Sequence, residues 1–390
     1  MKKQGTCLIT YYLALASLIA SPIAAQDPTL DPSMPYSARR ENPVTYKVDF
    51  SVVVTPPYHA KKLAVWLPIP QTDAAQEITG SRLSTFPQSV EPRVATESVF
   101  GNRFAYFEFA SPQGAQIIRH QFQVTICELH WDLDPGRVQN VTTWPSTFDK
   151  YRRGDSQAIL VDNRFEKLLN EIVPQRGGAY SDLSDVMTWV EQNFAYDHND
   201  ASLRANAEHG LLKRRGHCSD YHSFCASMGR VLGVPTRVTY GINTFPKNSP
   251  SHCKLEAFLV PYGWVSFDVS ETQKLISDIR DSKDLGEAAR TELKALAQAR
   301  LLSGFRDNTW YLQTWGTDYD LVPPANAGRI PVVRTAYIEA DGVPLPEPDP
   351  AAKGQTAFSW MCVSQFKSDR EIVYPFKNWS SLKTNARQSP

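Results

Sequence analysis

GHCSDYHSFCASMGRVLGVPTRVTYG (residues 216–241) joins a cysteine, a helical pattern and a strand in one short stretch. Gly216 precedes the helical pattern, and Gly233 with Pro235 ends it. The segment VPTRVTYGI that follows is typical of a β-strand. The apolar positions that recur at helical spacing are Tyr221, Phe224, Cys225, Met228, Val231 and Leu232. The stretch therefore predicts a helix that begins at Cys218 and leads into a strand.

A cysteine at the first position of a helix has unusual chemistry. The helix dipole and the free backbone N–H groups favour the thiolate, so the pKa of Cys218 should fall. The same N–H groups could stabilise the oxyanion that forms when a thiolate attacks a carbonyl. Cys218 is therefore a candidate nucleophile, and a base must come from another part of the chain.

The candidate base lies in a predicted hairpin. HCKLEAFLV and GWVSFDV flank a turn at Pro261 to Gly263. His252 opens the first strand and Asp268 lies near the end of the second, on the same face as diagonal neighbours. A cysteine with a histidine that is oriented by an acid is a complete set for acyl transfer.

These motifs resemble the transglutaminase-like core of the papain-type cysteine hydrolase superfamily. The resemblance covers about 180–275, through the Gly-x-Cys-x-Asp-Tyr turn, the Leu-Gly-Val-Pro-x-Arg strand entry, and Glu, Trp and Asp at 4, 12 and 16 residues after the histidine. It implies that Cys218 is the nucleophile, His252 the base and Asp268 the orienting acid. It also implies that no metal or organic cofactor is required. The segment KKLAVWLPIP (61–70) is similar to the sandwich domain that precedes this core in bacterial relatives.

Two residues depart from the family pattern. Lys254 stands where the family usually has tryptophan, and His222 stands where a small residue is usual, one helical turn after Cys218. A bulky, titratable neighbour could tune the thiol or narrow the cleft. No side-chain oxyanion donor can be identified upstream of the cysteine.

Other uses of the cysteines compete with this interpretation. Cys218 and His222, four residues apart, with His217, His252 and Cys253 close in sequence, suggest a zinc site, but adjacent strand residues point to opposite faces. A Cys218–Cys225 disulfide would span about 10 Å along a helix, beyond the ~7 Å limit. A disulfide between Cys127 and Cys362 remains open.

Several polar and aromatic residues have simpler interpretations. Asp220 is expected to complement the helix dipole. His198, in YDHND, is expected to lie in a solvated loop. Trp189 and Trp264 are expected to be core residues, because both lie on periodic apolar faces.

The N-terminus and the cysteine count point to export. Residues 1–25 have the form of a secretory signal peptide, with Lys2 and Lys3, an apolar run too short to span a bilayer, and a cleavage site after Ala25. We therefore expect a periplasmic or secreted protein with no integral membrane segment after cleavage. Of six cysteines, Cys7 would leave with the signal, so the five that remain include at least one free thiol.

Composition and periodicity predict an α+β protein. Hydrophobic content of 42%, charged content of 21% and zero net charge over 390 residues indicate an ordinary folded chain and argue against nucleic acid or an anionic membrane as the main partner. After a linker at 26–43, period-two alternation predicts a β-sandwich at 44–135. The resemblance implies a transglutaminase-like core, at 136–340, with helices expected at about 183–194 and 288–302 and a β-rich C-terminal extension. Residues 341–390 have no assigned structure.

The functional expectation is an exported cysteine-dependent acyl-transfer enzyme that acts on a protein or peptide substrate through a thioester. If water attacks the thioester, the enzyme is a peptidase or amidase, which the aqueous setting favours. If an amine attacks it, the enzyme is a transglutaminase. The alternative is a catalytically silent binding or assembly module, which the two departures at Lys254 and His222 motivate.

Overall fold

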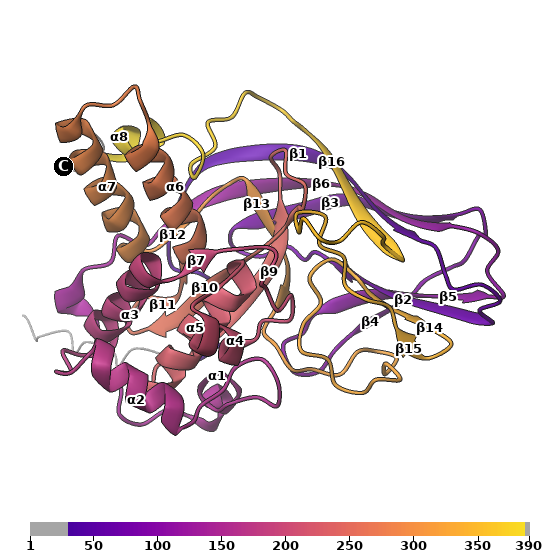
Figure 1. Ribbon diagram of the computed structural model, residues 1–390, viewed down its shortest axis with the longest axis horizontal. Helices are drawn as coiled ribbons and strands as arrows, with labels where there is room; N and C mark the ends of the chain where they lie inside the picture. The colour runs from indigo at the N-terminus through magenta and orange to yellow at the C-terminus, as the bar shows by residue number, and fades with distance from the viewer. Residues whose placement is uncertain (1–29, 387–390) are drawn as a thin grey trace, which may run out of the picture.

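The computed structural model describes residues 30–386, in which a helical region and two packed sheets lie side by side (Figure 1). The α+β class predicted from the sequence is confirmed. The expected signal peptide at 1–25, with its cleavage site, lies outside the described residues. Within those residues, no helix combines the length and the apolar character needed to cross a membrane.

The β-sandwich consists of two antiparallel five-stranded sheets. The first has the order β12 (Phe305–Arg306), β6 (Gln116–His130), β1 (Arg39–Val54) and β16 (Trp360–Ser368), with β3 (Gln76–Phe86) also paired to β6. The second has the order β15 (Val343–Pro344), β14 (Tyr337–Ala340), β2 (Lys62–Ile69), β5 (Arg103–Ala110) and β4 (Arg93–Thr96).

Period-two alternation produces this sandwich, as predicted. The even-numbered residues of β1 from Val44 to Val54 are buried and face apolar residues of β2 and β5 across one core. Strand β1 begins at Arg39, before the expected start at 44, and its pairing with β6 shifts between Glu41 and Val44. Pro43, which has no N–H to donate, lies at this irregularity. Residues 39–43 are mostly exposed, so the alternation of buried and exposed side chains begins only at Val44.

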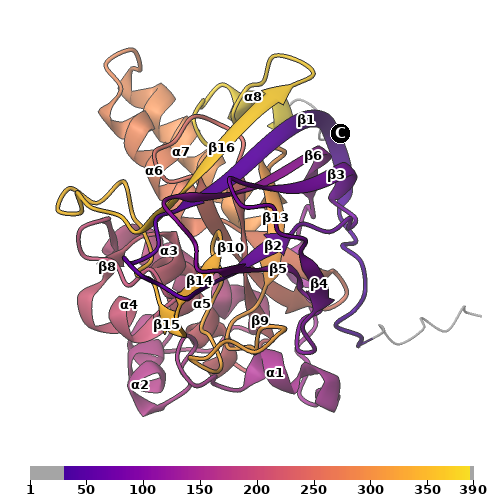
Figure 2. The same cartoon turned by 90° about the vertical axis from the view of Figure 1, so that its right-hand side faces the viewer.

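Segments from the C-terminal part of the chain complete both sheets. Strand β16 pairs with β1 from Tyr46↔Ser368 to Val54↔Trp360, and β14 pairs with β2. Figure 2 shows β16 beside β1 at the outer edge of the sheet. The chain therefore leaves the sandwich after β6, forms the helical region, and returns to the sandwich.

The helical region is built on a third antiparallel sheet, in the order β11 (Gly263–Phe267), β10 (Ser251–Leu259), β9 (Thr236–Asn243) and β13 (Trp310–Trp315). The predicted helices are present as α5 (Cys218–Val231), α3 (Ala179–Asn193) and α7 (Glu287–Leu302). The remaining elements are η1 (Pro135–Arg137), η2 (Ser146–Phe148), α1 (Asp149–Arg152), α2 (Asn163–Ile172), β7 (Ala195–Tyr196), α4 (Ala207–Lys213), β8 (Arg215–Gly216), α6 (Val269–Asp281) and α8 (Ser381–Ala386).

Helix α5 is the centre of the helical region. All its residues except Val231 are buried, because the sheet covers one side and α2, α3 and α4 cover the others. The polar residues His222, Ser223 and Ser227 of α5 are therefore buried together with its apolar stripe. The first residue of α5, Cys218, is thereby fixed against β10.

Gly241 in β9 permits a close approach of strands next to the site. It lies opposite His252 on β10, and a Cβ atom there would lie 2.1 Å from the Tyr311 carbonyl oxygen and 2.6 Å from the Trp310 ring. The Trp310 Nε1–H in turn donates to the His252 carbonyl oxygen at 3.1 Å. The missing side chain therefore allows β13 to support the strand that carries His252.

Replacing this glycine should destabilise the protein. We expect Gly241→Ala to lower the free energy of unfolding by about 3 kcal/mol, because the clash is with backbone as well as with a ring. The measurement is urea denaturation followed by fluorescence. The matched control is Gly354→Ala, where no heavy atom lies within 4 Å of the added carbon. Equal denaturation midpoints for the two variants would show that the close approach is not needed.

Candidate active site

A reciprocal cap fixes the start of α5 and therefore the place of Cys218. His217 is the N-cap residue, and its Nδ1 accepts a hydrogen bond from the Ser219 N–H at 3.2 Å. Asp220 accepts one from the His217 N–H at 3.2 Å, so its role extends beyond the predicted complement to the dipole. Gly216 has a φ of +137°, and a Cβ there would lie 2.2 Å from the Asp220 carboxylate. Glycine is thus required just before the cap.

The hairpin β10–β11 brings His252 and Asp268 together. Leu255 pairs with Phe267, and continuing this register places Asp268 opposite residue 254, with His252 as its diagonal neighbour. The His252 Nε2 lies 2.7 Å from the Asp268 Oδ2, and both side chains are buried. The structure therefore brings together the second and third residues of the predicted set.

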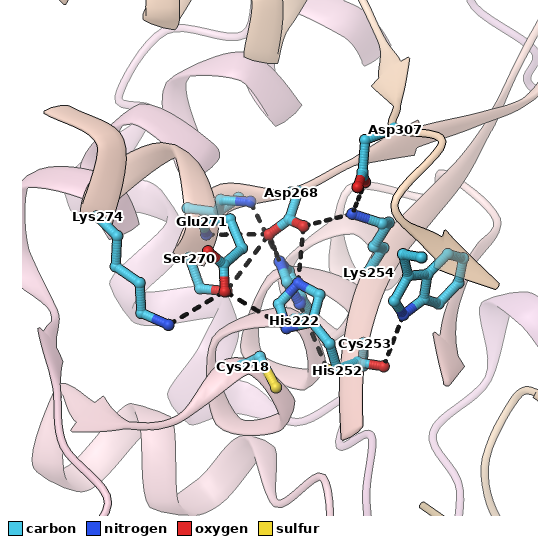
Figure 3. Close-up of polar contacts among 12 residues, drawn as sticks. Cys218, His222, His252, Cys253, Lys254, Asp268, Ser270, Glu271, Lys274 and Asp307 are labelled. Atoms are coloured by element: carbon cyan, nitrogen blue, oxygen red, sulfur yellow. Dashed lines mark hydrogen bonds and ion pairs between the residues drawn. The ribbon is translucent and has the colours of Figure 1, made fainter. Parts of the chain in front are cut away.

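The same register explains Lys254, the first departure from the family pattern. Its Nζ lies 2.6 Å from the Asp268 Oδ2 and 2.8 Å from the Asp307 Oδ1, in the loop after β12 (Figure 3). Burial alone would disfavour the Asp268 carboxylate, but the charges of His252 and Lys254 hold the pKa of Asp268 well below its usual value. Lys254 thus keeps the acid ionised.

Cys218 and His252 influence each other's ionisation. A hydrogen bond from the Cys253 thiol, opposed by burial and assisted by the charge of His252, lowers the pKa of Cys218 well below its usual value. Burial opposes the imidazolium of His252, but Asp268 and Cys218 outweigh it and raise the pKa of His252. The His252 Nδ1 is buried and has no hydrogen-bond partner among residues 30–386. Cys218 is 4% exposed, so the thiol is nearly closed off from solvent.

His222, the second departure, is a neutral structural residue. Its Nε2 accepts a hydrogen bond from the Val269 N–H at 3.1 Å, so the ring proton lies on Nδ1, which faces the Cys253 sulfur at 3.5 Å. Burial lowers the pKa of His222 to about 4. The ring therefore links α5 to the start of α6 and remains uncharged at neutral pH.

Two residues near the thiol were not found in the sequence. Burial and the nearby Cys218 thiolate raise the pKa of Tyr196, which lies close to Cys218 because β7 pairs with β8 directly before α5. The Glu271 Oε1 lies 4.0 Å from the His252 Nδ1. A signal for Glu271 does exist, since Asp268-Val-Ser-Glu271 has the form of a capping box at the start of α6, where the Asp268 side chain accepts from the Glu271 N–H at 3.0 Å.

The remaining cysteines are thiols. Cys127 and Cys362 are not bonded to each other, and Cys225 is buried on α5 without a disulfide. In the described part of the chain, no group of three or more His, Cys, Asp or Glu side chains is arranged to hold a metal ion.

His198 lies in a loop, as predicted, but the expectation that it is solvated was wrong. Its Nδ1 lies 2.8 Å from the Oδ2 of the buried Asp349, so the histidine forms a structural pair within the loop. Trp264 is buried, as predicted, under the Arg237 guanidinium at 4.1 Å from the ring centre. Arg237 also pairs with Glu256 at 2.7 Å. These three motif residues therefore form a structural cluster.

Comparison with known proteins confirms the family resemblance. Residues 166–269 match the model of the transglutaminase-like superfamily, so the chain contains a transglutaminase-like core. A crystal structure from Cytophaga hutchinsonii, provisionally described as a cysteine protease, shares the fold at a TM-score of 0.60 and 15% identity, over 87% of this chain and 96% of that one. An uncharacterized protein of Haemophilus influenzae is 25% identical over 190 residues, which span 42% of this chain and 49% of the relative. That similarity thus spans about half the length of the curated relative.

The lowered pKa of Cys218 predicts how its labelling depends on pH. Because the thiolate persists below the usual range, the rate of alkylation by iodoacetamide should stay high as pH falls from 9 to 6, whereas a thiol of pKa about 8.5 slows about tenfold per unit. The measurement is peptide mass spectrometry after timed labelling. His252→Ala and Cys253→Ala should each shift the midpoint upward, since each removes a group that favours the thiolate. A profile equal to that of the urea-unfolded protein would contradict the assignment.

The buried Lys254 should be important for stability. Lys254→Met leaves Asp307 buried without its cation and should lower the free energy of unfolding by about 3–5 kcal/mol. Lys254→Met/Asp307→Asn should recover part of this loss, because it removes the unpaired charge. Chemical denaturation measures both. Lys62→Met, which breaks an exposed pair with Glu108, is the control and should cost ~1 kcal/mol or less; an equal loss in the two single variants would contradict the prediction.

Proposed function

We propose that this protein is a cysteine-dependent acyl-transfer enzyme that hydrolyses peptide or other carboxamide bonds through a thioester. The observation that carries the proposal is the buried His252–Asp268 pair, with Nε2 and Oδ2 2.7 Å apart, beside Cys218 at the start of α5. The lowered pKa of Cys218 and the raised pKa of His252 agree with this geometry. A depressed thiol pKa beside a histidine oriented by an acid is the condition for a cysteine nucleophile. The pattern of residues 1–25 supports an exported location.

In the first half of the reaction, the Cys218 thiolate attacks the carbonyl carbon of the substrate. The developing oxyanion is stabilised by the Cys218 backbone N–H, and Tyr196, on the strand paired with β8 directly before α5, is the candidate side-chain donor. The His252 imidazolium then gives its Nδ1 proton to the leaving amine. The C–N bond breaks, and the acyl group remains on the sulfur as a thioester.

In the second half, His252 is neutral and acts as a base. It removes a proton from water as the water attacks the thioester, and the C–S bond breaks to release the carboxylic acid and the Cys218 thiolate. Asp268 holds the ring through Nε2 and stabilises its charged form. Lys254 acts only through Asp268, so its presence in place of tryptophan removes no group that the reaction uses.

A silent binding module is the second candidate, and the closure of the site favours it. Cys218 is 4% exposed and His252 is 2% exposed, so a substrate must displace side chains to reach the sulfur. The transglutaminase reaction differs only in the acceptor, since an amine resolves the thioester instead of water. The three candidates therefore predict different products from the same mixture.

One incubation separates the three candidates. The protein is mixed with a library of defined peptides and a fluorescent primary amine in H₂¹⁸O, and the products are analysed by mass spectrometry. Hydrolysis gives new carboxyl termini that contain ¹⁸O, and we expect this result. Cys218→Ala should reduce the rate by at least about 10³-fold, because the nucleophile is lost. Amine incorporation would identify a transglutaminase, and no product beyond that of Cys218→Ala would indicate the binding module.

A further inference from the structure

Three lysines from separate parts of the chain converge on one buried carboxylate beside the site. The Glu271 side chain is bound by Lys274 on α6 at 3.1 Å, by Lys247 in the loop between β9 and β10 at 3.4 Å, and by Lys377 in the C-terminal segment at 2.6 Å. The Glu271 side chain is 2% exposed, whereas the lysine side chains are 17–33% exposed. We call Lys247, Lys274 and Lys377 the lysine cluster.

The lysine cluster carries more positive charge than Glu271 can neutralise. Three ammonium groups and one carboxylate leave a surplus of two charges. Among residues 30–386, none of the three lysines has a second carboxylate within ion-pair distance, and each Nζ makes its single hydrogen bond to Glu271. An ammonium has three N–H donors, so each lysine retains donors for another partner.

The lysine cluster lies next to the reacting groups. Glu271 stands between Lys274 and His252 (Figure 3), with its Oε1 4.0 Å from the His252 Nδ1. Lys274 is close enough to Cys218 for the two charges to act on each other. A ligand held by the lysine cluster would therefore lie beside the bond that Cys218 attacks.

Aromatic rings limit where the lysines can move. The Lys274 ammonium lies 3.6 Å from the centre of the Tyr196 ring, and Tyr196 lies on β7, which pairs with β8 directly before Cys218. The Lys377 and Lys247 ammonium groups lie 5.2 and 6.0 Å from the centre of the Phe245 ring. These contacts lower the mobility of long side chains and so favour a defined binding site.

We propose that the lysine cluster binds a carboxylate of the peptide substrate, adjacent to the scissile amide, and that this enzyme selects anionic acyl donors. The proposal rests on the proposed function, because it assigns the specificity of the same site. Glu271 orients the three ammonium groups, and the surplus charge attracts the substrate group. A neutral peptide of equal size leaves the surplus charge uncompensated and should react more slowly.

Two alkylating agents, one anionic and one neutral, test carboxylate binding by the lysine cluster without catalytic turnover. Iodoacetate carries a carboxylate and iodoacetamide does not, and both alkylate Cys218. We expect the iodoacetate/iodoacetamide rate ratio to exceed that of the urea-unfolded protein by about tenfold at low salt and to fall in 0.5 M salt, because exposed charges are screened. The Lys247→Gln/Lys377→Gln variant should lose most of this excess, whereas Lys167→Met, on α2, should keep it.

The ratio is formed within each variant, so a general change in thiol reactivity cancels. Slow labelling by both reagents would contradict the proposed function, and the ratio would still decide the present inference. A ratio equal to that of the unfolded protein, or one unchanged in Lys247→Gln/Lys377→Gln, would overturn the carboxylate site. Lys377→Gln alone provides the same test with one exposed residue if the double variant has a lowered melting temperature.

Matched peptides identify the source of the carboxylate. Pairs that differ only as Glu against Gln test a side-chain carboxylate, and pairs that differ as a C-terminal acid against an amide test a terminal one. We expect the wild-type protein to prefer the acidic member of one of these pairs about tenfold or more in kcat/KM. Lys247→Gln/Lys377→Gln should lose this preference. Equal kcat/KM within both pairs would overturn the inference.

Discussion

The ionised Asp268 carboxylate, buried where β11 ends and α6 begins, is the constraint on which the site depends. A charge in the interior is costly unless it is paired and hydrogen-bonded, so each of its contacts is needed. Its Oδ2 contacts His252 and Lys254, and its Oδ1 accepts from the first turn of α6. Through Lys254 it also fixes Asp307 in the chain that returns toward the sandwich. One carboxylate thus aligns the hairpin, a helix and a distant loop.

Charges alternate in sign outward from Asp268. The positive His252 and Lys254 surround it, the Cys218 thiolate and Glu271 face His252, and the lysine cluster surrounds Glu271. Each group stabilises the charged form of its neighbours, which explains why so many ionised side chains share a nearly dry interior. The outermost groups are the partly exposed lysines, which carry the excess positive charge. The uncompensated charge therefore lies on the solvent side of the site.

The parts of the fold and site that could be predicted from sequence depend on local sequence patterns. The start of α5 at Cys218 and the diagonal placement of His252 and Asp268 follow from helical spacing and from a single turn, which short-range rules describe well. Lys254 departs from the family pattern, yet continuing the hairpin register makes it the direct partner of Asp268, and the two side chains pair at 2.6 Å.

The contacts that could not be predicted join residues far apart in sequence. His198 and Asp349 are 151 positions apart, and β16 completes a sheet that begins at Arg39. Strand β3 is mostly exposed, so it lacks the alternation that reveals a half-buried strand. Lys247, Lys274 and Lys377 each resemble any surface lysine until the fold brings them around Glu271.

The pairing of β16 with β1 has a consequence for the order of folding during synthesis. While the ribosome is still making the helical region, β1 can pair with β6, but its other edge has no partner until residues 360–368 emerge. An apolar strand with one open edge is prone to associate with other chains, and pairing across such a sequence separation is slow. Lys377 follows still later, so the lysine cluster around Glu271 is completed only after β16 has been made. The open edge of β1 therefore persists throughout synthesis of the helical region.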